Sequence, residues 1–148
     1  MSRILLVADV VWVRNDVRAA LSDPDYEVIE TADAETAAQA AYHHDVDAVV
    51  VDLQVGSRGG MAVTREVRAL SHLLDRPAPG VIMLLDRTVD AFLAKRAGAD
   101  GWMPKPFTAR QLRSAIAAAI ERPPVLGRPE PADEAPLREP VAQPVADG

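Results

Sequence analysis

The sequence predicts an α/β protein built on a doubly wound, mainly parallel sheet, and two observations support this. Short apolar segments alternate along the chain with longer segments in which apolar residues recur at helical spacing, as in repeated strand–helix units. Residues 48–51 and 81–85 are apolar at every position, which is typical of strands buried on both faces of a parallel sheet.

The first half of this pattern begins with a strand at residues 4–7, an apolar run closed by Ala8 and Asp9. A helix is expected over residues 12–21, where apolar residues recur at helical spacing between charged ones. Residues 26–31 are half polar, so the second strand is expected near an edge of the sheet.

The middle of the chain repeats the unit twice. Asp33 is expected to cap an alanine-rich helix over residues 34–42. The third strand, residues 48–52, ends in an acid and is followed by a helix over residues 61–74. A proline-rich turn then precedes the fourth strand, residues 81–85.

A fourth helix is expected over residues 89–96, with Phe92 and Leu93 turned toward the sheet. Gly98 follows it, at a position that favours a left-handed residue. Residues 102–103 then predict a short fifth strand.

The last helix is expected over residues 109–120. Thr108 and Gln111 have the spacing of a capping box, which opens a helix.

Composition restricts the class of function. The 148 residues suffice for one ordinary domain. The net charge of -6 and the lack of a basic stripe argue against nucleic-acid binding, and the absence of cysteine excludes a disulfide framework or a thiolate metal site. No apolar run approaches the roughly 20 residues that cross a bilayer, and the first residues lack a signal-peptide pattern. We therefore expect a cytoplasmic protein without membrane contact.

The chain is expected to divide into one folded domain, residues 1–121, and a proline-rich disordered tail, residues 122–148. The tail segment holds seven of the twelve prolines and shows neither helical nor strand period. Such a segment buries too little apolar surface to offset the entropy of ordering it. No second folded domain is expected after it.

Chemistry-bearing residues follow four of the predicted strands. Asp9 comes after the first, Asp52 ends the third, Leu85 ends the fourth and Lys105 follows the fifth. Parallel strands place their carboxyl ends at one sheet edge, where open α/β sheets keep their sites. Two carboxylates with a carbonyl from the next loop suit Mg²⁺, and a lysine suits a bound anion. Asp52 could then act as a nucleophile that accepts a phosphoryl group.

Four segments carry a resemblance to a known family: residues 4–9 (ILLVAD), 50–53 (VVDL), 98–100 (GAD) and 105–107 (KPF). In joint order and spacing, from about residue 3 to residue 120, they resemble the receiver domain of two-component response regulators, the CheY-like family. The resemblance implies a flavodoxin-like (βα)5 fold, with a five-stranded parallel sheet in the order 2-1-3-4-5 and helices on both faces.

The resemblance also implies roles for individual residues. Asp52 would be the phosphoacceptor, and Lys105 would contact the phosphoryl group. Asp9, Asp52 and the Gln54 main-chain carbonyl would hold Mg²⁺. The Lys105–Pro106 peptide bond would be cis, as proline permits.

The chain departs from the family pattern at several positions. Ala8 stands where receivers usually carry a first acid, so one water-mediated metal contact is missing. At the two switch positions, Leu85 replaces a hydroxyl residue that would bond the phosphoryl group, and Trp102 replaces a smaller aromatic. Asp86 stands where a small residue is usual, and its carboxylate could point inward or to solvent.

These features predict an atypical, stand-alone receiver in phosphorelay signalling that is not an enzyme. A sensor histidine kinase or another phosphodonor would phosphorylate Asp52. Output would come from protein contact through the face of residues 89–96, 102–103 and 109–120, or from a homodimer. Trp12 could anchor a partner at the mouth of the crevice or pack over the loop.

Three alternatives remain open. A pseudo-receiver would dock constitutively without phosphorylation. An aspartate-nucleophile phosphatase would need a second acid two residues after its nucleophile, where this chain has Gln54. A flavin or nucleotide carrier would need a phosphate-binding loop, and no such pattern occurs in the sequence.

Overall fold

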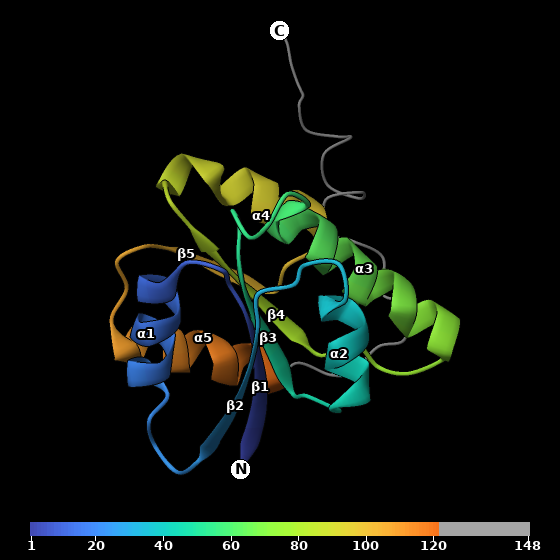
Figure 1. Ribbon diagram of the computed structural model, residues 1–148, viewed down its shortest axis with the longest axis horizontal. Coiled ribbons are helices and arrows are strands. Elements are labelled where there is room, and N and C mark those ends of the chain that lie inside the picture. The colour runs from blue at the N-terminus through green and yellow to red at the C-terminus, as the bar shows by residue number, and fades with distance from the viewer. Residues whose placement is uncertain (122–148) are drawn as a thin grey trace, which may run out of the picture.

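A five-stranded parallel sheet runs through the centre of the molecule in the order β2-β1-β3-β4-β5 (Figure 1). The computed structural model describes residues 1–121, so the predicted tail lies outside the described residues. Helices α1 and α5 pack on one face of the sheet, and α2, α3 and α4 pack on the other. The predicted fold class, strand order and edge position of the second strand are confirmed.

The element bounds lie close to those expected from the sequence. The strands are β1 Ser2–Val7, β2 Tyr26–Thr31, β3 Ala48–Asp52, β4 Gly80–Leu85 and β5 Gly101–Pro104. The helices are α1 Val11–Ala20, α2 Ala37–His43, α3 Gly59–Leu74, α4 Ala91–Ala97, with a 3-10 turn Thr88–Asp90 before it, and α5 Ala109–Glu121. Within residues 1–121, no helix combines the length and the apolar character needed to cross a bilayer.

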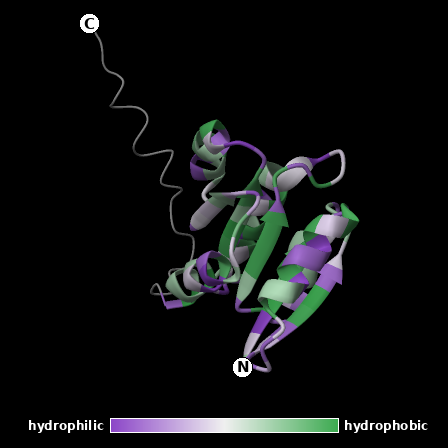
Figure 2. Cartoon of the chain, turned by 90° about the vertical axis from the view of Figure 1, so that its left-hand side faces the viewer, coloured by the Kyte–Doolittle hydropathy of each residue, from purple (hydrophilic) through white to green (hydrophobic). Residues whose placement is uncertain are grey.

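Side-chain alternation along the strands divides the interior into two cores. Leu5 and Val7 of β1 face α2, α3 and α4, whereas Ile4 and Leu6 face α1 and α5. Strands β3 and β4 are buried at every position, and Figure 2 shows the hydrophobic residues concentrated in the sheet. Burial on both faces fixes the strand register, and with it the points at which the strands end.

The prediction that Asp33 caps α2 is wrong. The helix begins at Ala37, and its N-cap residue, Thr36, makes no side-chain capping bond. The Asp33 carboxylate instead accepts hydrogen bonds from the Glu35 N–H (2.9 Å) and the Thr36 hydroxyl (3.0 Å). Asp33 therefore stabilises a turn before the helix, a local bond that competes with capping for this residue type.

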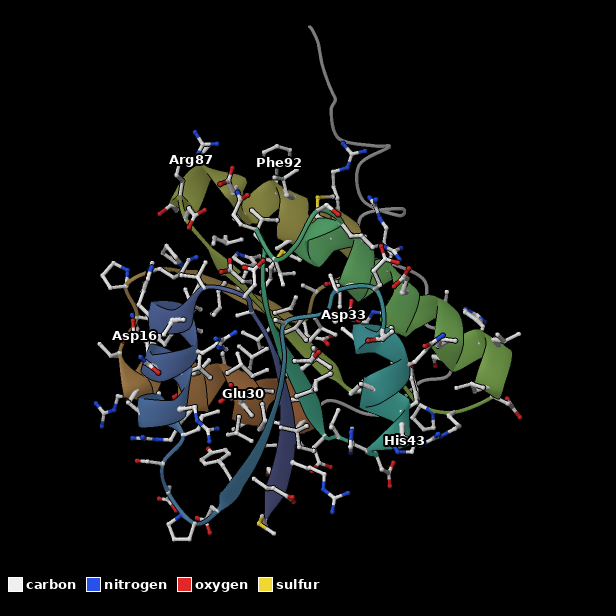
Figure 3. The ribbon with its side chains drawn as sticks, in the orientation of Figure 1. Asp16, Glu30, Asp33, His43, Arg87 and Phe92 are labelled. Atoms are coloured by element: carbon white, nitrogen blue, oxygen red, sulfur yellow. The ribbon has the colours of Figure 1, made fainter. Side chains whose placement is uncertain are left out.

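The expected position of Phe92 is also wrong, because its side chain is 54% exposed and points away from the domain (Figure 3). Helix α4 begins at Ala91, after the 3-10 turn, and turns Ala94 and Ala97 into the core. Two residues before Ala94, Phe92 falls on the opposite side of the helix. Leu93 packs partly against the core, as expected.

Two predicted helix-end signals are confirmed. Gly98 follows α4 with a φ of 89°, in the left-handed region that glycine adopts without strain. The Gln111 N–H donates to the Thr108 hydroxyl (3.0 Å) and the Thr108 N–H donates to the Gln111 side chain (2.8 Å), which completes the capping box before α5.

Gly60 sets how closely the first turn of α3 approaches the end of β3. A Cβ at this position would lie 2.7 Å from the Asp52 main-chain oxygen and 3.0 Å from the Leu53 Cα, and backbone atoms cannot move aside as side chains can. We expect Gly60→Ala to lower the free energy of unfolding by about 1–3 kcal/mol, as in overpacked sites. Chemical denaturation measures this difference.

Gly101→Ala is the matched control. Its Cβ would meet the tip of the Ile82 side chain at 3.0 Å, and that side chain can shift. The control should lose less stability than Gly60→Ala. Equal losses would show that the approach of α3 to β3 is not tight.

Tyr42 joins α2 to α3, because its buried hydroxyl donates to the Val67 carbonyl (2.6 Å). Burial raises the pKa of the phenol above its usual 10.0, against smaller lowering effects of Ser71 and two arginines. In the window just above pH 10 the unfolded chain therefore loses this proton before the folded one. The stability tied to the protonated phenol is present below that window and is lost as the pH rises through it.

We expect Tyr42→Phe to cost about 0.5–1.5 kcal/mol near neutral pH, the usual net value of one hydrogen bond. The gap between wild type and variant should narrow above about pH 10.5, because the variant has no phenol to ionise. Urea denaturation at both pH values measures the gap. A gap that widens with pH would contradict the account.

Candidate functional site

A buried ion pair lies at the carboxyl edge of the sheet. Asp52 ends β3 with 1% of its side chain exposed, and Lys105 follows β5 with 7% exposed. The Lys105 Nζ lies 3.1 Å from Asp52 Oδ1 and 3.3 Å from Oδ2. The parallel strands end at one edge, so the structure brings these two predicted site residues together across β4.

Asp9 reaches the same edge from the end of β1. Its side chain is exposed, and Oδ2 accepts a hydrogen bond of 2.9 Å from the Gly56 N–H. Gly56 lies in the loop after Asp52 with a φ of 55°, which favours glycine. Asp9 is thereby tied to the loop that carries Gln54, whose N–H donates to Asp52 Oδ1 (3.2 Å).

Asp86 also belongs to the site, and the structure resolves its orientation. Its Oδ1 lies 2.9 Å from the Lys105 Nζ, although 47% of its side chain is exposed. The residue before it, Leu85, is fully buried in the core beneath α2, α3 and α4. The end of β4 therefore presents a carboxylate, and no hydroxyl, to Lys105.

Trp12 covers the ammonium from α1. The Lys105 Nζ lies 5.5 Å from the centroid of its ring, within the range of a cation–π contact. The residue is still 54% exposed. Trp12 thus packs over Lys105 at the mouth of the crevice while part of its ring remains accessible.

The site holds more negatively charged groups than positively charged ones. Burial by itself lowers the pKa of Lys105, but hydrogen bonds to Asp86 and Asp52 raise it by more than burial lowers it. The net pKa therefore lies above its usual 10.5, and the side chain is an ammonium at neutral pH. The carboxylates of Asp9, Asp52 and Asp86 outnumber this one cation. The arrangement therefore favours an added cation.

The donor chemistry fits a hard divalent ion with few protein ligands. Asp9 and Asp52 offer carboxylate oxygens, and the loop after Asp52 offers main-chain carbonyls. Within residues 1–121, no three acidic, histidine or cysteine side chains gather closely enough to hold a metal by themselves. Mg²⁺ suits such a set, because it keeps several waters and takes one or two protein carboxylates.

A second buried ion pair, which the sequence did not predict, joins Arg68 of α3 to Asp100 (3.1 Å). Arg68 also donates to the Gly98 carbonyl, and the Asp100 carboxylate accepts the Val81 N–H (2.8 Å). These bonds tie α3 to the segments before β5 and at the start of β4. The helical pattern around Arg68 indicated an apolar face and gave no sign of a buried cation.

Residues 4–117 match the family model of the response regulator receiver domain. The chain belongs to this family. The matched segment contains every candidate site residue and all of the sheet except Ser2 and Arg3 of β1. The predicted resemblance is therefore confirmed, and with it a place in two-component signalling.

A curated relative matches the chain over part of its length. The aerobic respiration control protein ArcA of Escherichia coli is 29% identical over 112 residues, which cover 74% of this chain and 44% of that protein. The chain thus spans less than half the length of the curated relatives that it matches.

Solved structures agree with the fold. A receiver domain protein from Clostridium thermocellum is 25% identical with a TM-score of 0.70, over 82% of this chain and 96% of that one. CheY4 of Vibrio cholerae is 28% identical with a TM-score of 0.68, over 80% and 98%. The receiver domain of the Pseudomonas aeruginosa sensor kinase PA1611, also 25% identical (TM-score 0.70, 82% and 98%), has a magnesium ion coordinated in its active site cleft.

Removing Lys105 should leave the buried Asp52 charge without its cation. We expect Lys105→Met to lower the free energy of unfolding by about 3 kcal/mol, the usual penalty for an orphaned buried charge. Adding Asp52→Asn should restore part of the loss, since that change removes the orphaned charge. Denaturation of the single and double variants measures the coupling.

Lys95→Met on α4 is the control, because Lys95 is exposed and its loss should change stability by less than about 0.5 kcal/mol. Strictly additive losses for Lys105→Met and Asp52→Asn would contradict a functional ion pair in solution.

Proposed function

We propose that this receiver accepts a phosphoryl group on Asp52 in the presence of Mg²⁺ and acts through protein contact. The observation that carries the proposal is the Lys105–Asp52 pair at the end of the central strand. It sets a buried carboxylate nucleophile beside a cation that can contact a phosphate oxygen. A sensor histidine kinase or a small phosphodonor would supply the group, and such a module would act in the cytoplasm.

In the proposed reaction an Asp52 oxygen attacks the phosphorus of a phosphohistidine or an acyl phosphate. The bond from phosphorus to the donor breaks, its electron pair leaves with the donor, and Asp52 becomes a mixed anhydride. Lys105 neutralises charge on the transferred group. Asp9, Asp52 and the Gln54 carbonyl would hold Mg²⁺, which when bound would neutralise further charge.

The switch that follows phosphorylation is expected to be weak. Leu85 cannot offer the transferred group the hydrogen bond that a hydroxyl would provide, and bonds to charged groups contribute about 1.5–3 kcal/mol. The activating bias should be lower by roughly ten- to a hundredfold. Output would use the α4–β5–α5 face, where Val89, Phe92 and Trp102 are exposed, for a protein partner or a second copy of the chain.

Constitutive docking without phosphorylation is the second candidate function. The Asp86–Lys105 contact favours it, because Lys105 is already paired with two carboxylates. A phosphatase is less well supported, since the exposed Gln54 amide cannot act as a general acid.

Acetyl phosphate labelling tests the proposal. With Mg²⁺ present, the wild type should incorporate phosphate, and Asp52→Asn should not. Chelation of Mg²⁺ should abolish labelling, because the carboxylates would then repel the incoming anion. Mass spectrometry of the intact protein measures incorporation.

Asp25→Asn is the matched control, because this exposed aspartate precedes β2 at the opposite end of the strands. It should label as the wild type does. Labelling that persists in Asp52→Asn would contradict the assignment of the acceptor, and an unlabelled wild type would favour constitutive docking.

A further inference from the structure

Asp86 makes a shorter polar contact than Asp52 to the side-chain ammonium of Lys105. The Nζ–Oδ1 distance to Asp86 is 2.9 Å, against 3.1 Å and 3.3 Å to the oxygens of Asp52. The Trp12 ring lies on the ammonium as well. A lysine ammonium has few N–H donors, and here they are engaged by two carboxylates beneath an aromatic ring.

The two carboxylates differ in how easily they can release the ammonium. Asp52 is 1% exposed, so withdrawing Lys105 from it would leave a buried charge. Asp86 is 47% exposed and can turn into water at small cost, as surface ion pairs do. Asp86 is therefore the partner that Lys105 can exchange.

Nearby charges do not hold Asp86 away from Lys105. The adjacent Arg87 pairs with Asp90 (3.1 Å) in the 3-10 turn before α4. Leu85, on the other side, is apolar and buried. An anion that enters the site must then share Lys105 with the carboxylate of Asp86.

We propose that Asp86 is an internal anion that competes with an incoming phosphoryl group for Lys105 and thereby lowers the affinity of the site for that group. Asp86 is a positioning residue: it acts through Lys105. When it swings to solvent, Lys105 is released to bind the anion. The inference rests on the proposed function, because it concerns the same site.

Beryllofluoride, a phosphoryl mimic, tests the competition. The chain has two tryptophans, so in a Trp102→Phe background all tryptophan fluorescence comes from Trp12. This signal reports on the surroundings of the Lys105 ammonium, which contacts the Trp12 ring. We expect Asp86→Asn to bind beryllofluoride with Mg²⁺ about fivefold more tightly than its parent, a factor typical of a half-exposed ion pair. Its affinity for Mg²⁺ alone should stay equal or fall, because one nearby negative charge is lost.

Asp25→Asn, which removes the same charge at the other end of the strands, should leave both affinities unchanged. Unchanged or weaker beryllofluoride binding by Asp86→Asn, with the parent still binding, would overturn the competition alone. Loss of binding in every variant, the parent included, would overturn the proposed function as well.

Nuclear magnetic resonance tests the pair without any phosphoryl mimic. In the metal-free protein the side-chain carboxyl carbon signal of Asp86 should shift in Lys105→Met, while that of Asp25 should not. An unmoved Asp86 signal would show that the two side chains do not interact, and the inference would fall.

Discussion

The ion pair between Lys105 and Asp52 is the interaction on which the site depends, because it must form inside the protein between strands that are not neighbours. Removing two charges from water is costly unless their geometry is precise. The sheet supplies that geometry: β3 and β4 are buried along their whole length, and Gly60 lets α3 approach the Asp52 main chain closely. The Arg68–Asp100 pair stabilises the start of the neighbouring strands in the same way.

Around that pair the site departs from the family pattern in the position of its charges. Ala8 removes one carboxylate from the metal side, whereas Asp86 adds one on the side of the lysine. The metal would then be held by fewer protein ligands, and the ammonium is shared before any phosphoryl group arrives. Leu85 removes a neutral hydrogen-bond donor from the same edge. Under the proposed function, each change would weaken the coupling between phosphorylation of Asp52 and conformational switching without removing the proposed acceptor.

The sequence predicted the fold and the placement of Asp9, Asp52 and Lys105 at one edge of the sheet, because apolar runs mark buried strands and parallel strands end at one edge. The sequence-based predictions were wrong where local hydrogen bonding or a local turn determines the position of a side chain. Asp33 bonds to a turn instead of capping α2, and a single 3-10 turn rotates Phe92 to the surface. The burial of Arg68 was not predicted, because its helix shows an apolar pattern and burial of a cation depends on a partner that is distant in sequence. The orientation of the Asp86 side chain likewise depends on Lys105, so the three-dimensional structure is needed to determine it.

Under the proposed function, residues distant in sequence meet around a divalent cation at the carboxyl edge of the sheet. Paramagnetic Mn²⁺ takes the same oxygen ligands as Mg²⁺ and broadens nuclear magnetic resonance signals near its site. We expect the amide signals of four site residues to broaden at low Mn²⁺: Asp9, Asp52, Gln54 and Lys105. The signals of Asp45 and Asp47, which precede β3 at the other end of the sheet, should stay sharp. Broadening centred on Asp45 and Asp47, with sharp signals at Asp9 and Asp52, would contradict this expectation.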